Sequence, residues 1–114
     1  MSKVNTAVIT ATVSGDGAAY TDSDTVTNNT FAVAPTSATL ASGANTITVP
    51  SGSVGVKIKP PPTNTVVLTL KGVSGDTGIN ISPSSPTYIA LASGVGSFVI
   101  NASTTGCTVL LIWT

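Results

Sequence analysis

Residues 54–62 read VGVKIKPPP. Hydrophobic side chains at every second position alternate with Lys57 and Lys59, which is the period of a strand that buries one face and exposes the other. Three prolines follow at once. Proline fixes an extended backbone and has no N–H to donate to a neighbouring strand, so the strand must end there. This stretch therefore predicts a β-strand with Val54, Val56 and Ile58 facing inward.

The same two-residue period recurs along the whole sequence, and no stretch keeps the 3.6-residue period of a helix. About eight strands, spaced by about ten residues and separated by Gly, Pro, Asn and Ser turns, predict a single antiparallel β-sandwich of the jelly-roll or Ig-like kind. Residues 14–24 are expected to form a loop, and residues 93–96 and 103–106 have the length of hairpin turns. The predicted strands are residues 4–13, 25–33, 45–49, 54–59, 65–71, 87–92, 97–102 and 107–113, and residues 79–81 are an optional short strand in the connection after residue 71.

The length of 114 residues fits one domain, residues 1–114, and a hydrophobic fraction of 41% is enough for one core. A chain terminus is ordered only where something ties it down, so residues 1–5 are a candidate docking arm. The N-terminus lacks the apolar core of a secretory signal, and no apolar run approaches the roughly 20 residues of a membrane span. We therefore expect synthesis in a cytoplasm and no membrane partner.

Charged residues make up only 7% of the chain, whereas an ordinary soluble domain has about 25%. There is no His, Glu or Arg, and Thr, Ser, Asn and Gly supply the polar surface instead. Few ions have to be desolvated when such a surface meets another protein, so it does little to oppose close association. We interpret the chain as a component of an assembly. The ionic residues are Lys3, Lys57, Lys59, Lys71, Asp16, Asp22, Asp24 and Asp76.

The same composition argues against several function classes. A catalytic serine or cysteine needs a base, and without His only Lys or Asp could serve, so we predict no catalytic residues and no enzyme. Four scattered lysines cannot form the basic patch that nucleic acid requires. Cys107 lies in an apolar segment and is expected to be a buried, structural thiol. Glycan binding is open, but five aromatic residues are a poor supply of exposed platforms.

Two loops have a superficial likeness to ligand sites. Asp16, Asp22 and Asp24 could suggest calcium, but their spacing does not fit an EF-hand, and solvated turn residues explain them as well. Residues 72–78 are glycine-rich, but they lack the Gly-Lys-Ser/Thr ending of a phosphate loop and no helix follows. A wide turn with positive φ is the preferred interpretation, and no metal or cofactor is predicted.

The last predicted strand contains the run Val109 to Trp113, which is apolar on both faces. One explanation is a central strand that the fold covers on both sides. The other is that a neighbouring subunit covers one face, since apolar patches on small proteins often mark contacts. Trp113, beside the C-terminus, is the natural anchor for such a contact.

The second half of the chain resembles small all-β virion proteins of tailed bacteriophages. The likeness extends from about Val56 to Trp113. It consists of a strand that ends in two prolines, a Leu-Thr-Leu-Lys-Gly-Val segment, a Gly-Asp-Thr-Gly-Ile segment, a Pro-Thr strand start and a Leu-Ile-Trp ending. These stand at residues 60–61, 68–73, 75–79, 86–87 and 111–113, with Asn64-Thr65 between the first two.

The resemblance implies a virion location and a non-enzymatic structural role as a decoration (cement) protein on the outer capsid shell. The implied partner is the major capsid protein or another virion protein, and a homo-oligomer is expected, with a trimer preferred. The alternatives are a neck or tail component and a glycan-binding module carried on the particle. The candidate interface residues are Met1, Ser2, Lys3, Val4 and Trp113.

Overall fold

A computed structural model describes the backbone of residues 3–15, 18–30 and 34–114, and the side chains of residues 34–114. Within these ranges the chain forms ten β-strands and no helix. It divides into two units, Met1–Ala32 and Val33–Thr114. The first unit is a two-stranded hairpin and the second contains two four-stranded sheets.

The hairpin joins β1 (Lys3–Gly15) to β2 (Ala18–Thr30) in an antiparallel register that runs from Lys3 opposite Thr30 to Gly15 opposite Ala18. The predicted loop at residues 14–24 is therefore wrong for most of its length. Asp and Ser favour turns, but Thr and Tyr in the same segment favour strands, and the facing strand β1 supplies a partner for their backbone. Of the predicted docking arm, Met1 and Ser2 lie outside the described residues, and residues 3–5 begin β1.

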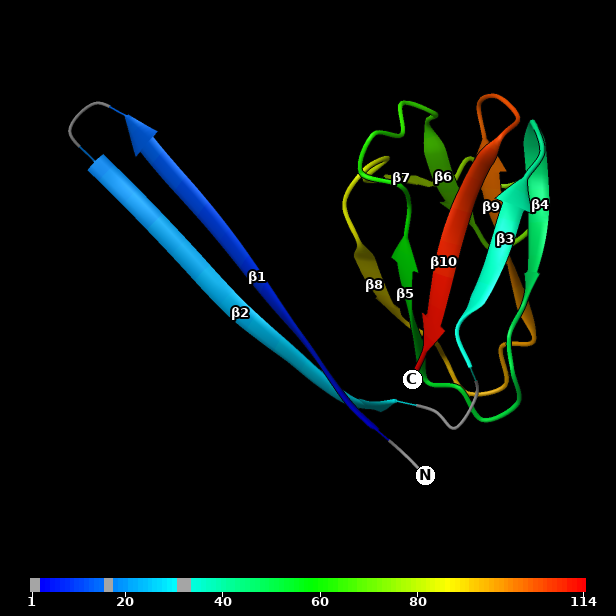
Figure 1. Ribbon diagram of the computed structural model, residues 1–114, viewed down its shortest axis with the longest axis horizontal. Coiled ribbons are helices and arrows are strands. Elements are labelled where there is room, and N and C mark those ends of the chain that lie inside the picture. The colour runs from blue at the N-terminus through cyan, green and yellow to red at the C-terminus, as the bar shows by residue number, and fades with distance from the viewer. Residues whose placement is uncertain (1–2, 16–17, 31–33) are drawn as a thin grey trace. The chain divides into compact units, whose positions relative to one another are not determined.

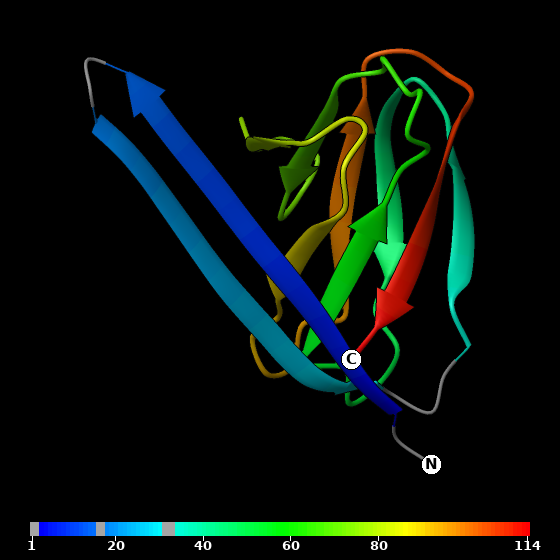
Figure 2. The same ribbon diagram turned by 60° about the vertical axis from the view of Figure 1, so that its left-hand side comes forward.

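The second unit is a β-sandwich, as the sequence predicts (Figures 1 and 2). The first sheet has the strand order β3-β10-β5-β8, and the second sheet has the order β4-β9-β6-β7, with all neighbours antiparallel. The strands are β3 (Thr36–Leu40), β4 (Gly43–Thr48), β5 (Gly55–Lys59), β6 (Leu68–Lys71), β7 (Ile79–Ile81), β8 (Thr87–Ala90), β9 (Ser97–Ala102) and β10 (Cys107–Trp113).

The order of strands in the two sheets is that of a jelly roll. Among the described sandwich strands, only β6 and β7 are consecutive in the chain and paired in one sheet. Every other connection crosses from one sheet to the other. The turns at residues 93–96 and 103–106 are therefore not hairpins: each leads the chain between sheets. A short glycine-containing turn reverses the chain in either case, so the local sequence cannot distinguish the two.

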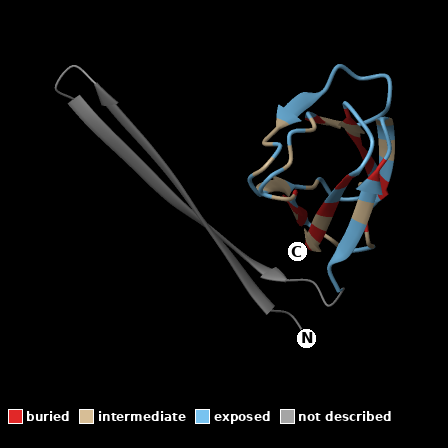
Figure 3. Ribbon diagram, turned by 45° about the horizontal axis from the view of Figure 1, so that its top comes forward, coloured by how far each residue is buried: buried red, intermediate tan, exposed pale blue. Residues whose placement is uncertain are grey.

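The core lies between the two sheets, and the buried residues come from both (Figure 3). Phe98 on β9 and Trp113 on β10 meet edge to face with ring centroids 6.5 Å apart. The Trp113 indole is 1% exposed, and its Nε1 donates a hydrogen bond to Thr36 Oγ1 at 3.2 Å. Trp113 is therefore a core residue whose indole is not presented to a partner, which corrects its assignment as a contact anchor. The other buried apolar residues are Leu40, Ile47, Val49, Val56, Ile58, Leu68, Val99, Ile100, Ala102, Cys107, Val109 and Leu111.

The strand pattern differs from the sequence prediction in several details, among them the later start of β6 at Leu68 and the earlier end of β8 at Ala90. Val54 is 58% exposed, because β5 begins at Gly55 and Val54 precedes the paired part of the strand. β10 is central in its sheet but alternates, with Leu110 and Ile112 half-buried on its outer face. β3, residues 36–40, was not predicted, because only its last residue, Leu40, is strongly hydrophobic and buried.

A close contact on the outer face of the first sheet requires glycine at position 55. The Tyr88 side chain extends past Gly55, and its hydroxyl lies 3.2 Å from Thr114 Oγ1, within hydrogen-bond distance. A Cβ at Gly55 would lie 2.8 Å from Tyr88 Cζ and 2.9 Å from Thr114 Oγ1. These separations are far below a normal contact, and Gly55 is itself buried.

We predict that Gly55→Ala lowers the free energy of unfolding by about 1–3 kcal/mol, because the added methyl group overpacks this contact. Gly75→Ala is the control, since a Cβ there meets nothing within 4 Å, and its effect should stay within about 0.5 kcal/mol. Chemical denaturation of both variants measures the difference. Equal stability of the two would show that Tyr88 moves aside without cost.

Candidate binding surfaces

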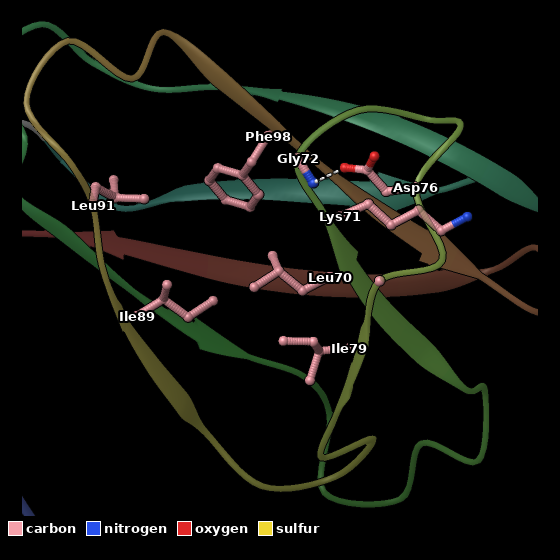
Figure 4. A pocket seen from close by; sticks show the side chains of 9 residues that line it. Leu70, Lys71, Gly72, Asp76, Ile79, Ile89, Leu91 and Phe98 are labelled. Atoms are coloured by element: carbon pink, nitrogen blue, oxygen red, sulfur yellow. Dashed lines mark hydrogen bonds between the residues drawn. The ribbon is translucent and has the colours of Figure 1, made fainter.

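One side of the sandwich is open where the edge strands β7 and β8 end the two sheets. A cleft of about 390 Å³ lies there, between the sheets. Its walls are apolar, and Figure 4 shows their side chains pointing toward a common space. They come from four strands and one connecting segment: Leu70, Ile79, Ile89, Phe98 and Leu91. Ile79 is 72% exposed, so the cleft presents a hydrophobic surface to solvent.

The glycine-rich loop at residues 72–78 forms the polar rim of this cleft. The Asp76 carboxylate accepts hydrogen bonds from the backbone N–H groups of Gly72, at 3.1 Å (Figure 4), and Val73, at 3.0 Å. These two donors are the kind that would otherwise face an anion. Because a carboxylate of the same loop already holds them, the loop is a self-closed turn and not a phosphate cradle. Gly78, at φ 81°, confirms the predicted positive φ.

Gly78 is also packed tightly at the cleft. A Cβ there would lie 2.5 Å from the Leu70 carbonyl oxygen and 2.7 Å from side-chain atoms of Thr69 and Lys71. Gly94 has nearly the same backbone angle, φ 83°, but a Cβ there would meet nothing within 4 Å. The two glycines therefore separate the cost of backbone strain from the cost of a clash.

We predict that Gly94→Ala lowers the free energy of unfolding by about 1 kcal/mol, because alanine is strained in the left-handed conformation. Gly78→Ala should cost at least about 1 kcal/mol more, because it adds overpacking against the β6 backbone. Denaturation midpoints of the two variants at equal m-value give the comparison. Equal losses would mean that β7 shifts away from β6 freely.

A second surface lies on the outer face of the first sheet. Lys57 stands directly opposite Ile112 and Tyr88 on its two neighbouring strands, and Lys59 stands opposite Leu110. The apolar side chains are half-buried there, and the aliphatic stems of lysines commonly cover such neighbours while the ammonium groups stay in water. We call these five residues the lysine face.

The Cys107 thiol has the buried position that the sequence predicts, at 3% exposure in the core. Burial raises the pKa of this thiol, because the apolar surroundings disfavour the thiolate. The thiol is consequently a poor nucleophile at neutral pH.

The raised pKa of Cys107 predicts a loss of stability in alkaline solution. The unfolded chain releases the thiol proton above about pH 8.5, while the folded chain still holds it, so the free energy of unfolding falls as pH rises from that value until it passes the folded pKa. The slope can reach about 1.4 kcal/mol per pH unit. Urea denaturation of wild type and Cys107→Ala between pH 7 and pH 10 isolates this contribution. Parallel pH profiles would contradict it.

The other residues that the sequence analysis singled out lie where the structure describes at most the backbone. Lys3 and Val4 are described only as backbone of β1, and the side chains of Asp16, Asp22 and Asp24 lie outside those described. Among the described residues, no three His, Cys, Asp or Glu side chains gather as metal ligands do. Over the same residues, no helix has the length and hydropathy needed to cross a membrane.

Comparisons with known proteins add no relative. No family model, no curated protein and no solved structure matches this chain. The cleft and the lysine face are therefore identified from the structure of this chain alone. Sequence reasoning did not identify the cleft, because its residues belong to different sheets that only the strand order brings together. The lysine face was foreshadowed by the alternation in residues 54–59.

Proposed function

We propose that this chain is a non-enzymatic structural protein of a bacteriophage virion, and that it decorates the outer surface of the capsid shell. It acts by shape and contact, and its partners are the major capsid protein and further copies of itself. The observation that best supports the proposal is the small number of charged residues in the sandwich. Its only ionic residues are Lys57, Lys59, Lys71 and Asp76, so large parts of it can be covered by protein with little desolvation of charge.

The strand order supports the proposal by analogy. Eight-stranded jelly rolls are a recurrent architecture of viral capsid proteins. The same architecture also occurs in lectins and in cupins, so a fold of this kind is compatible with several activities. The jelly-roll fold supports the virion role here because residues 56–113 also resemble phage virion proteins.

The hairpin supports an assembly role independently. β1 and β2 are joined by thirteen register pairs and form a unit of their own. A two-stranded hairpin is marginally stable in water, since it buries little apolar surface. A hairpin of this length gains stability when a further layer of protein covers one of its faces.

Glycan binding is the less favoured alternative on the described residues. Sugar sites use exposed aromatic rings as platforms, whereas Phe98 and Trp113 are core residues. Tyr88 is half-buried and its hydroxyl lies against Thr114. A neck or tail position differs from a capsid position mainly in copy number.

The proposal predicts hundreds of copies per particle. Quantitative mass spectrometry of purified virions of the phage that encodes this chain, calibrated on the major capsid protein, measures that number. Several dozen copies or fewer would favour the neck or tail. Complete absence from washed particles, together with binding of the purified protein on a glycan array, would overturn the structural role.

A further inference from the structure

Two strands of this chain carry opposite charges in the same arrangement. Asp22 and Asp24 occupy alternate positions of β2, and Lys57 and Lys59 occupy alternate positions of β5. Alternate positions of a strand are separated by roughly 6.6 Å and belong to one face. The two carboxylate-bearing positions and the two ammonium-bearing positions therefore have the same spacing.

The neighbouring strand in the hairpin places an apolar residue beside each aspartate. The register sets Asp22 opposite Ala11 and Asp24 opposite Ile9. These four positions form a block in which one strand is acidic and the other is apolar.

The lysine face has the same pattern with the sign reversed. The register sets Lys57 opposite Ile112 and Lys59 opposite Leu110. The apolar pair is half-buried, so part of its surface remains available to a further layer. A basic strand beside an apolar strand matches an acidic strand beside an apolar strand, in spacing as well as in charge.

The two units as a whole also carry opposite formal charges. Residues 1–32 contain one lysine and three aspartates, a formal charge of −2, whereas residues 33–114 contain three lysines and one aspartate, a formal charge of +2. The chain as a whole is neutral. Attraction between unlike units of separate copies is therefore possible without net repulsion between the copies.

We propose that the lysine face binds the β1–β2 hairpin of a second copy of this chain. Asp22 and Asp24 of one copy pair with Lys57 and Lys59 of the next, and the adjoining apolar positions pack together. The hairpin has two strands, and two strands about 4.8 Å apart and about six residues long cover on the order of 200 Å². One such contact is small, so a closed arrangement in which every copy gives one hairpin and receives one is needed for stability.

Such a contact joins two different surfaces, and contacts of that kind close into rings when the rotation between copies allows it. In this contact the marginally stable hairpin packs on the first sheet of the sandwich and forms a third layer. The inference does not depend on the virion role, because it concerns the purified protein alone.

A charge-exchange experiment tests the contact. The first variant is Lys57→Glu with Lys59→Glu, and the second is Asp22→Lys with Asp24→Lys. Wild type is expected to form oligomers at low salt and to dissociate as the ionic strength rises, because salt screens exposed charges. Each variant alone should associate at least about tenfold more weakly, since like charges then face each other.

Mixing the two variants in equal amounts is the decisive step. The acidic sandwich of the first variant then meets the basic hairpin of the second, and the basic sandwich of the second meets the acidic hairpin of the first. Association should return in the mixture, as chains or even-membered rings in which the two variants alternate, which a contact inside one chain cannot produce. Sedimentation velocity of each variant and of the mixture gives the three association states.

Two controls keep the result specific. Lys71→Glu reverses one charge on the second sheet, and its effect should be much smaller than that of Lys57→Glu. Asp22→Asn with Asp24→Asn removes the acidic charges at nearly constant volume and should weaken association to an intermediate degree. A monomeric wild type at low salt, equal effects of the two single lysine reversals, unchanged association of the asparagine variant, or a mixture that stays dissociated would each overturn the proposal.

Discussion

β10 is the strand on which the sandwich depends. It pairs with β3 on one side and β5 on the other, so it holds the first sheet together, and its inner face carries Trp113 against Phe98 of the second sheet. The Trp113 indole also reaches Thr36 of β3 through its N–H. Removing an aromatic side chain of this size from a core typically costs about 3–5 kcal/mol, a large share of the stability of a small domain.

The two faces of β10 have different roles. The inner face is fully buried, and its packing requires the second sheet. The outer face leaves Leu110 and Ile112 half-buried beside the two lysines of β5. The apolar run Val109 to Trp113 is compatible with a strand buried on both faces. In the structure only its inner face is fully buried, and its outer face is half-buried.

A surface with few ions has consequences for every proposed contact. Association between such surfaces is limited by shape and by a small number of charges, because there is little desolvation of ions to oppose it. The few charges that are present then determine which surfaces meet. In this chain they are divided between the two units with opposite sign, −2 in residues 1–32 and +2 in residues 33–114.

The fold class and the bounds of several strands could be predicted from the amino-acid sequence. The strand at 55–59, its end at the prolines after Lys59, and the strands at 97–102 and 107–113 follow from side-chain period and backbone chemistry, which are local properties. The sequence also indicated the buried Cys107. Which strands are neighbours could not be predicted, because a glycine turn of four residues reverses the chain equally well within one sheet or between two. The strand order created the apolar cleft between β7 and β8, and packing between the sheets buried Trp113. Pairing with β1 placed residues 18–24 in strand β2 instead of the expected loop. Each of these outcomes rests on a partner strand distant in the sequence or on a pairing that local propensity alone does not specify.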